Sequence, residues 1–314
     1  MSKMGNPKIA GAGICCLDHI LVAPQITWGD TAQLEDYRTQ GGGLVGTALV
    51  ACCRLGAECR MFSFLGDDEV GDQIAAGLVA EGISVAGIAR ICGGASPFSF
   101  IHVDSRSGER TIFHRAASGT EKAQLPDLSW ISGCDALLID DYYPSLALAA
   151  AKTAQDKGIP VVADVTMISP KNLEFFRNVS VLIAPRKFAA QIRYGDDLPD
   201  ALEAIHRLGP KIALITLGSE GWISSSPEGK SRGKAFKVEV ADTTGAGDAF
   251  HGAFAYGLTQ GWGTDRCAEF ASAVAAIKCS KPGGRTGLPS LSQAVVFLKR
   301  KGRLNWSDFE IQAA

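Results

Sequence analysis

The sequence lacks the long apolar runs of membrane-spanning helices, since no stretch reaches about 18 uninterrupted apolar residues. Residues 9–23 come nearest to a secretion signal, but Asp18 and His19 interrupt them, and a strand that ends in polar residues explains them better. Charge of one sign is not in excess either. The formal net charge of −2 provides no general attraction to nucleic acid or to an anionic membrane. We therefore expect a soluble, cytoplasmic protein that acts on small molecules.

The nine cysteines lack the spacing of metal ligands. Cys15-Cys16 and Cys52-Cys53 are adjacent pairs, and the others are scattered among apolar residues, which predicts buried, reduced thiols. Two phosphate-binding motifs are also incomplete. Ser224 stands where a P-loop needs its first glycine, and Cys16 stands where a dinucleotide fingerprint that begins at Gly11 needs its third.

The chain has ample material for a core and many turns, with 46% hydrophobic residues and 36 glycines among 314 residues. Strand-like runs alternate with alanine-rich helical segments such as 44–54 and 146–157. The runs are 8–14, 60–64, 136–139, 161–163, 181–183 and 213–216. This order predicts an α/β fold with a mostly parallel sheet, helices on both faces, and ligands at the carboxyl ends of the strands.

The most informative stretch is 240–248, Val-Ala-Asp-Thr-Thr-Gly-Ala-Gly-Asp. Residues 237–240 alternate like a strand, and the apolar spacing from Phe250 to Leu258 predicts a helix that begins near Gly247. Amides in the first turn of such a helix bind anions, and Asp248 beside them would accept a proton from an attacking hydroxyl. The amides are those of Gly245, Ala246 and Gly247. The pattern predicts phosphoryl transfer; the alternative is an N-capping aspartate.

Residues 98–103 and 110–115 are predicted to pair as a hairpin around a turn at 105–108. Further strand material lies near 14–21 and 36–40. Together these segments would form a small β lid, with its strands within about 14–40 and 97–115. A surface hairpin without function is the alternative.

The stretch Asp-Thr-Thr-Gly-Ala-Gly-Asp at 242–248 resembles the second signature of the ribokinase (PfkB-type) carbohydrate kinases. The glycines at 41–43, Leu-Gly-Ala at 55–57 and Leu-Gly-Asp-Asp-Glu-Val-Gly at 65–71 resemble the first signature, in the expected order. This resemblance implies one domain over 1–314, with the ribokinase-like three-layer α/β/α fold and a β lid over the sugar. In several branches of the family the lid also joins two subunits, so a homodimer is expected.

The resemblance implies a role for each motif. Asp248 would be the catalytic base. Asp18, the glycines Gly41, Gly42 and Gly43, and His114 on the lid would bind the sugar. A structural hydrogen bond for Asp18 and a helix-entry turn for the glycines are the alternatives. Gly46 replaces an asparagine that touches the sugar in many relatives, so one hydroxyl contact is missing.

The nucleotide side follows from the same resemblance. Thr216, Gly218 and Gly221 match the turn that lines the ATP groove, and Gly284 lies on a loop, 281–285, where relatives close that groove. Some relatives hold a monovalent cation such as K⁺ there. ATP with Mg²⁺ is therefore the expected cofactor. Asp242 would lie near the magnesium-bearing phosphates, and its alternative is a turn-capping aspartate.

The expected activity is transfer of the γ-phosphoryl group of ATP to a free hexose or pentose, a ketose or a sulfosugar included. Gly43 replaces the lysine of the phosphosugar-kinase branch, which favours a free sugar. The segments 41–51 and 276–285 look most like the branch that contains sulfofructose kinase, with ketohexokinase more distant. A sulfonate would need Arg110, His114 or Arg115 of the lid. A nucleoside kinase, with Trp28, Phe98 and Phe100 near the base, and a non-catalytic sugar-binding regulator are the alternatives.

Overall fold

A computed structural model describes residues 6–26, 29–107, 109–165, 167–168, 173–192, 198–303 and Trp306. Its main feature is a nine-stranded sheet in the order β13-β12-β11-β10-β9-β8-β1-β4-β5. The strands from β5 to β11 in this order pair in parallel, and β12 and β13 are antiparallel additions at one edge. The strands are β1 Lys8–Ala12, β4 Glu58–Gly66, β5 Ser84–Ile91, β8 Ala136–Asp140, β9 Val161–Asp164, β10 Val181–Pro185, β11 Ile212–Thr216, β12 Trp222–Ser226 and β13 Gly229–Gly233.

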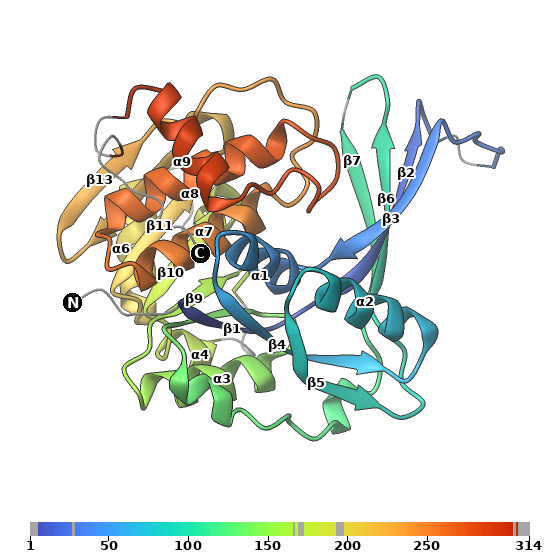
Figure 1. The fold of residues 1–314 in the computed structure, drawn as a ribbon, viewed down its shortest axis with the longest axis horizontal. Helices are drawn as coiled ribbons and strands as arrows, with labels where there is room; N and C mark the ends of the chain where they lie inside the picture. Colours follow the sequence, from blue (N-terminus) through green and yellow to red (C-terminus); the bar gives the residue numbers. More distant parts are fainter. Residues whose placement is uncertain are drawn as a thin grey trace.

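Helices cover both faces of this sheet (Figure 1). One face carries α1 Leu44–Arg54, α2 Glu69–Ala80, α7 Ala246–Thr259, α8 Thr264–Cys279 and α9 Leu291–Arg300. The other face carries α3 Pro144–Gln155, α4 Leu173–Phe176, α5 Arg186–Ile192 and α6 Leu198–Leu208. Short 3₁₀ turns lie at η1 Thr120–Lys122, η2 Ser129–Gly133 and η3 Gly218–Glu220.

The central strands bury both of their faces. In β8, Leu138 faces the core beneath α1 and α7, whereas Leu137 and Ile139 face the core beneath α3. Strands buried on both sides read as continuous apolar runs, which is why the six predicted strands were visible in the sequence. The three-layer α/β/α fold with a mostly parallel sheet is confirmed.

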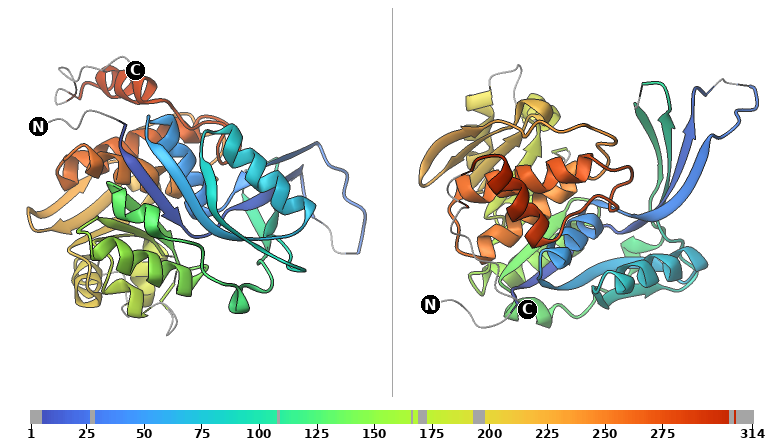
Figure 2. Two further views of the ribbon diagram at one scale, coloured as in Figure 1. Left: turned by 60° about the horizontal axis from the view of Figure 1, so that its bottom comes forward. Right: turned by 45° about the horizontal axis from the view of Figure 1, so that its top comes forward.

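A second sheet of four strands, in the order β3-β2-β6-β7, forms the lid. Its strands are β2 Cys16–Ala23, β3 Asp36–Gly42, β6 Phe98–Asp104 and β7 Arg110–Arg115. The two views in Figure 2 show these strands standing away from the main body. The predicted hairpin is present, because β6 pairs antiparallel with β7. The chain passes from β1 in the large sheet directly to β2 in the lid, so residues 9–23 are two strands.

Two local predictions are wrong. Residues 237–240 form no strand; the main chain of Ala241 and Asp242 instead donates hydrogen bonds to the carbonyl of Cys279, at the end of α8. The alternation in the sequence therefore reflects packing beside a helix and not pairing in a sheet. The cysteines are free thiols, as expected, but Cys92 is exposed and Cys53 is only partly buried. Of the helices that the structure describes, none is long and apolar enough to cross a membrane.

Candidate active site

The helix that carries Asp248 starts where the sequence predicts. Helix α7 begins at Ala246, and Gly245 precedes it with a φ of 75°. A side chain at Gly245 would also lie 2.7 Å from the Gly284 carbonyl oxygen, so both conformation and space require glycine there. The amide of Ala246 closes this turn by donating to Thr243 O at 3.2 Å. Gly247 is exposed, and no atom lies within 4 Å of the place of its missing side chain, which leaves open space for an anion.

Asp248 lies in a group of acidic residues at the carboxyl ends of neighbouring strands. Asp164 ends β9, Asp140 ends β8, and Asp18 belongs to β2 of the lid. Burial and then the charge of Asp164 raise the pKa of Asp248, and Asp18 adds to the rise. Burial raises the pKa of Asp140 to about 8, although it accepts hydrogen bonds from the amides of Ile14 and Tyr142.

His251, one turn after Asp248, joins this group to the sheet. Its Nδ1 lies 2.8 Å from Gly247 O and 3.3 Å from Asp164 Oδ2, and its Nε2 lies 3.0 Å from Ile183 O. These contacts tie the first turn of α7 to β9 and β10. The sequence analysis missed Asp164 and His251, because nothing in the local pattern shows that the end of β9 meets the start of α7.

Asp18 is buried on the lid side of the site. The Cys16 thiol donates to its Oδ1 at 3.3 Å, and a side chain at Gly42 would lie 2.7 Å from the same oxygen. Burial raises the pKa of Asp18, while Ser99, Arg285 and His114 act in the opposite direction. No basic side chain of the described residues lies within 4.0 Å of it. The carboxyl group is thus buried beside the glycines of 41–43 without an ion-pair partner.

His114 of β7 lies close to Asp18. Its Nδ1 is 3.2 Å from Ser99 Oγ, and its ring meets the ring of Tyr142 edge-on, with the centroids 5.4 Å apart. Burial lowers the pKa of His114, and the charge of Asp18 opposes that shift. The structure therefore brings Asp18, His114 and Asp248 together from β2, β7 and α7. The lid also reaches the motif directly, because Arg110 Nη1 donates to Thr243 Oγ1 at 2.6 Å.

Gly41 and Gly42 end β3, and Gly43 is the residue between β3 and α1. Gly43 has a φ of 86°, and a side chain there would lie 2.6 Å from Ile14 O. These residues form a floor of side-chain-free backbone beside Asp18, in which Gly41 and Gly43 are partly exposed and Gly42 is buried. Beneath this floor lies the guanidinium of Arg285, which the sequence analysis had assigned only to the nucleotide-side loop.

Asp242 holds two loops together. Its Oδ1 accepts the amide of Thr244 at 2.7 Å, and its Oδ2 accepts the amide of Gly283 at 2.7 Å. Its carbonyl accepts the ammonium of Lys278 at 2.8 Å, and that lysine is fully buried. These contacts fit the role of a turn cap, and they leave the proposed magnesium role to experiment. The described residues contain no cluster of three or more His, Cys, Asp or Glu that would hold a metal ion on its own.

The nucleotide-side turn follows β11 in the same sheet. Thr216 ends the strand, and the positive φ values of Gly218 (61°) and Gly221 (106°) allow the turn that Leu217 N closes onto Gly221 O at 2.8 Å. Gly284, from the loop after α8, lies against Gly245 and Gln40. An anion-binding helix start, a carboxylate beside it and a glycine-rich turn at the strand ends together define a site for phosphoryl transfer to a hydroxyl.

Comparison with known proteins agrees with this class. Residues 6–291 match the pfkB family carbohydrate kinases. The chain is 29% identical over 294 residues to the ribokinase of Haemophilus influenzae, covering 90% of this chain and 95% of the relative. A putative ribokinase from Agrobacterium tumefaciens has a similar structure, with a TM-score of 0.87 at 25% identity, over 98% of this chain and 100% of that one. The Arabidopsis thaliana ribokinase complexed with ribose and ATP has a TM-score of 0.83 at 21% identity, over 94% and 99% of the two chains.

The chain therefore belongs to the pfkB family of carbohydrate kinases, and it is a phosphotransferase that acts on a sugar hydroxyl.

Proposed function

We propose that this kinase transfers the γ-phosphoryl group of ATP to a hydroxyl of a free sugar. The observation that supports this best is that Asp248, at the start of α7, lies near enough to the buried carboxyl group of Asp18 from the lid for the charge of Asp18 to raise its pKa. Asp18 would accept a hydrogen bond from one sugar hydroxyl, and Asp248 would take the proton from the hydroxyl that attacks phosphorus. The amides of Gly245 and Gly247 would stabilise the negative charge that develops on the transferred group.

The nucleotide would lie between the turn of Thr216, Gly218 and Gly221 and the loop that contains Gly284. When bound, Mg²⁺ would neutralise charge on the phosphates of ATP. Asp242 is the residue of this chain that we propose near that metal ion. A monovalent cation near 281–285 is a separate hypothesis. The ammonium of Lys278 already donates to the carbonyl of Asp242, so a titration with K⁺ tests whether this loop needs a further cation.

A hexose or pentose, ketoses included, is the substrate that we favour. The absence of a lysine at Gly43 argues against an already phosphorylated sugar. A sulfosugar, as in the sulfofructose kinase branch, remains an alternative that His114 or the lid arginines would have to serve. The nucleoside alternative depends on aromatic residues: Phe98 is covered by the Arg115 guanidinium at 5.5 Å, Phe100 is exposed, and Trp28 lies outside the described residues.

The experiment that tests the function is a panel of free sugars, sulfosugars and nucleosides, each with ATP and Mg²⁺, read by ADP release. Asp248→Asn serves as the matched inactive control. Turnover of a free sugar that this variant loses supports the proposal. Selective turnover of nucleosides, or no turnover of any acceptor, contradicts it.

We also infer that the lid joins two subunits. Its exposed side chains include Tyr37, Phe100, Ile112 and Phe113, which are each more than 40% accessible. Tyr37, Phe100 and Phe113 share the lid face opposite that of Asp18 and His114, and a four-stranded sheet with such an exposed apolar face gains stability when a second sheet covers it.

A further inference from the structure

Arg285 comes from the loop after α8, yet its side chain ends beneath the sugar-side floor. Its Nη2 donates to Gly42 O at 2.8 Å, and its Nε lies 3.4 Å from Thr47 Oγ1. The residue is 6% exposed. It is thus a buried cation of the proposed sugar site, although the sequence places it more than two hundred residues from Asp18 and Gly42 of that site.

The positions around the guanidinium are glycines. A side chain at Gly41 would overlap Arg285, with its Cβ 2.6 Å from Cζ, and a side chain at Gly46 would have its Cβ 2.9 Å from Nη2. Contacts this short do not occur between real side chains, so a side chain at position 46 would have to displace the end of the Arg285 guanidinium, and its Cβ would also lie 3.0 Å from Cys15 Cβ. The glycines at 41 and 46 therefore create the volume that the guanidinium fills.

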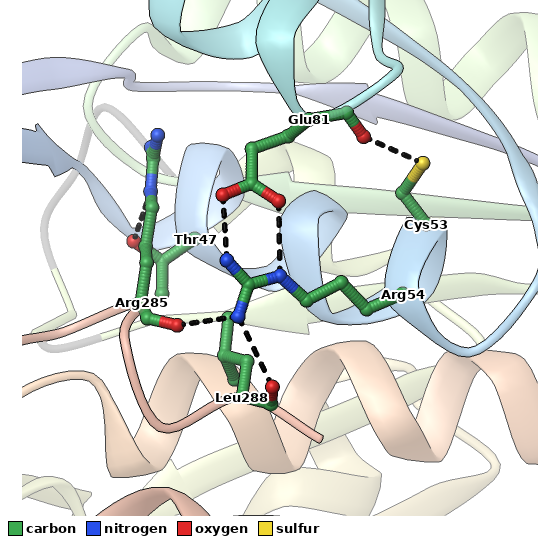
Figure 3. A network of polar contacts seen from close by, with 6 residues as sticks. All are labelled: Thr47, Cys53, Arg54, Glu81, Arg285 and Leu288. Atoms are coloured by element: carbon green, nitrogen blue, oxygen red, sulfur yellow. Dashed lines mark hydrogen bonds and ion pairs between the residues drawn. The ribbon is translucent and has the colours of Figure 1, made fainter. Parts of the chain in front are cut away.

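A second network holds the loop that carries Arg285 (Figure 3). Arg54 of α1 donates to the carbonyl oxygens of Arg285 at 2.8 Å and Leu288 at 3.0 Å. The same guanidinium makes a two-point ion pair with Glu81, at 2.9 and 2.6 Å. Figure 3 shows the Arg285 side chain running past Thr47 and away from this ion pair. Arg54 therefore holds the main chain of Arg285, whereas the guanidinium of Arg285 points toward Gly42.

That far end has unused hydrogen-bond donors. A guanidinium carries five N–H groups, and the described residues accept from Nε and from one N–H of Nη2 only. No carboxylate among them lies within 4.0 Å of the guanidinium, and Asp18 and Glu81 are the acidic residues whose charge reaches it. A buried charge with free donors is costly unless a partner accepts them. Gln40, the cross-strand partner of Asp18, is similar: its buried Nε2 has no acceptor in the described part of the chain.

We infer that Arg285 is a specificity-determining residue. Its guanidinium donates a hydrogen bond to one hydroxyl oxygen of the sugar, and the neighbouring hydroxyl donates a hydrogen bond to Asp18. The inference rests on the proposed function and names the substrate class: a neutral sugar with two neighbouring hydroxyls. A neutral group is favoured over an anion because the charge of Asp18 already reaches the guanidinium, so an anion bound there would lie close to that carboxylate. An acceptor and a donor side by side match a diol, in which one hydroxyl donates and its neighbour accepts.

The first test is Arg285→Ala in the full chain, with Arg232→Ala on the exposed edge strand β13 as the matched arginine control. The sugar kcat/KM should fall about 10- to 100-fold, mainly through KM, because a charge-assisted hydrogen bond is lost. The KM for ATP and the binding of ADP should stay near those of the control. Retained ADP binding shows that the variant is folded, because the backbone of residue 285 remains held by Arg54.

The second test pairs the variant with deoxy analogues of the preferred sugar. For one analogue, the wild-type enzyme should show the same fall in kcat/KM that Arg285→Ala shows with the parent sugar. With the variant, that analogue and the parent sugar should have the same kcat/KM. In the Arg285→Ala background, Gly46→Asn should recover part of the sugar KM, since an amide then enters the vacated volume. The same substitution alone should be harmful, because its side chain meets the guanidinium.

The outcomes separate the two claims. If the wild-type enzyme phosphorylates no sugar, the proposed function fails. If it phosphorylates a sugar and Arg285→Ala leaves the sugar KM unchanged, or if no single hydroxyl couples to Arg285, the specificity role fails while the function stands. A wild-type preference for a sulfonated or phosphorylated sugar that disappears in Arg285→Ala would overturn the neutral diol in favour of an anion site.

Discussion

A methyl group added where α7 packs on α1 should increase the distance between these two helices, which position the two parts of the proposed active site. Gly252 of α7 packs directly on α1: a side chain there would overlap Ala48 O and lie 3.0 Å from both Ala48 C and Ala51 Cβ. Cys52 of α1 also donates to Gly252 O at 3.2 Å. Helix α1 follows the glycines of 41–43, and Asp248 lies in the first turn of α7. The contact at Gly252 therefore helps to set the distance between these glycines and Asp248, the proposed catalytic base.

The magnitude follows from the geometry. Optimal carbon contacts lie at about 3.5–4.0 Å, and backbone atoms cannot rotate away as a flexible side chain can. Gly252→Ala must therefore push the helices apart by roughly 0.5–1 Å. Overpacking of this kind costs about 1–3 kcal/mol of stability. A displacement of about 1 Å between reacting groups lowers the rate by as much as 100-fold.

The assay compares Gly252→Ala with Gly77→Ala. Gly77 lies within α2, and no atom is within 4 Å of its missing side chain, so alanine there should raise stability by about 0.5–1 kcal/mol. Urea unfolding measures stability, and sugar-dependent ADP release measures kcat/KM. A Gly252→Ala enzyme with unchanged stability and unchanged kcat/KM would refute the argument that this contact sets the site geometry.

Four further predictions concern the site and the lid. Asp248→Asn should lower turnover at least ~100-fold with ATP binding retained, and near-normal turnover would contradict the role of base. Asp248 must be deprotonated to act as a base, so kcat/KM should rise as the pH passes its raised pKa. Asp164→Asn removes a negative neighbour and should move that rise to lower pH. An unchanged profile, or a move to higher pH, would count against the electrostatic coupling of Asp164 with Asp248. If Asp242 lies near metal-bound phosphates, Asp242→Ala should raise the Mg²⁺ concentration that the enzyme needs far more than it raises the sugar KM. Lower stability with an unchanged Mg²⁺ titration would show that Asp242 acts as a turn cap only. Size-exclusion chromatography with light scattering should find a dimer that Phe113→Asp converts to monomer, because Phe113 is exposed on the lid face opposite that of Asp18 and His114, and a fully active wild-type monomer at micromolar concentration would show that the lid closes without a partner.

Local patterns in the sequence were enough to predict most of the fold. The strands that end in Asp140 and Asp164 are continuous apolar runs because they are buried on both faces. Helix α7 begins within one residue of its predicted start, because Gly245 and the apolar spacing after it are both local signals. The segment 237–240 shows the limit of this approach. Alternation predicted a strand, but a strand also needs a neighbour with free backbone groups, and this segment lies beside α8 instead.

The parts of the site that the sequence did not reveal depend on contacts between distant segments. His251 looks like one more residue of an amphipathic helix until its ring is seen between Gly247, Asp164 and Ile183. Arg285 looks like part of a glycine-rich surface loop. Its side chain is buried in the space that Gly41 and Gly46, about 240 positions earlier, leave open because they have no side chains. The sequence does not indicate which residue occupies that space.

One short segment, from the end of α8 to the start of α9, connects the two substrate sides of the enzyme. Lys278 and Gly283 bind the carbonyl and carboxylate of Asp242, which begins the turn into the anion-binding helix start. A few residues later, Arg285 binds Gly42 in the sugar floor. The amides that we propose to bind phosphate and the glycines that we propose to bind the sugar are therefore linked through this segment as well as through the contact of α1 with α7. Because Arg54 holds the segment by the carbonyls of Arg285 and Leu288, a change in that loop should alter the sugar and the nucleotide sides together, whereas a change confined to the Arg285 side chain should alter the sugar side alone.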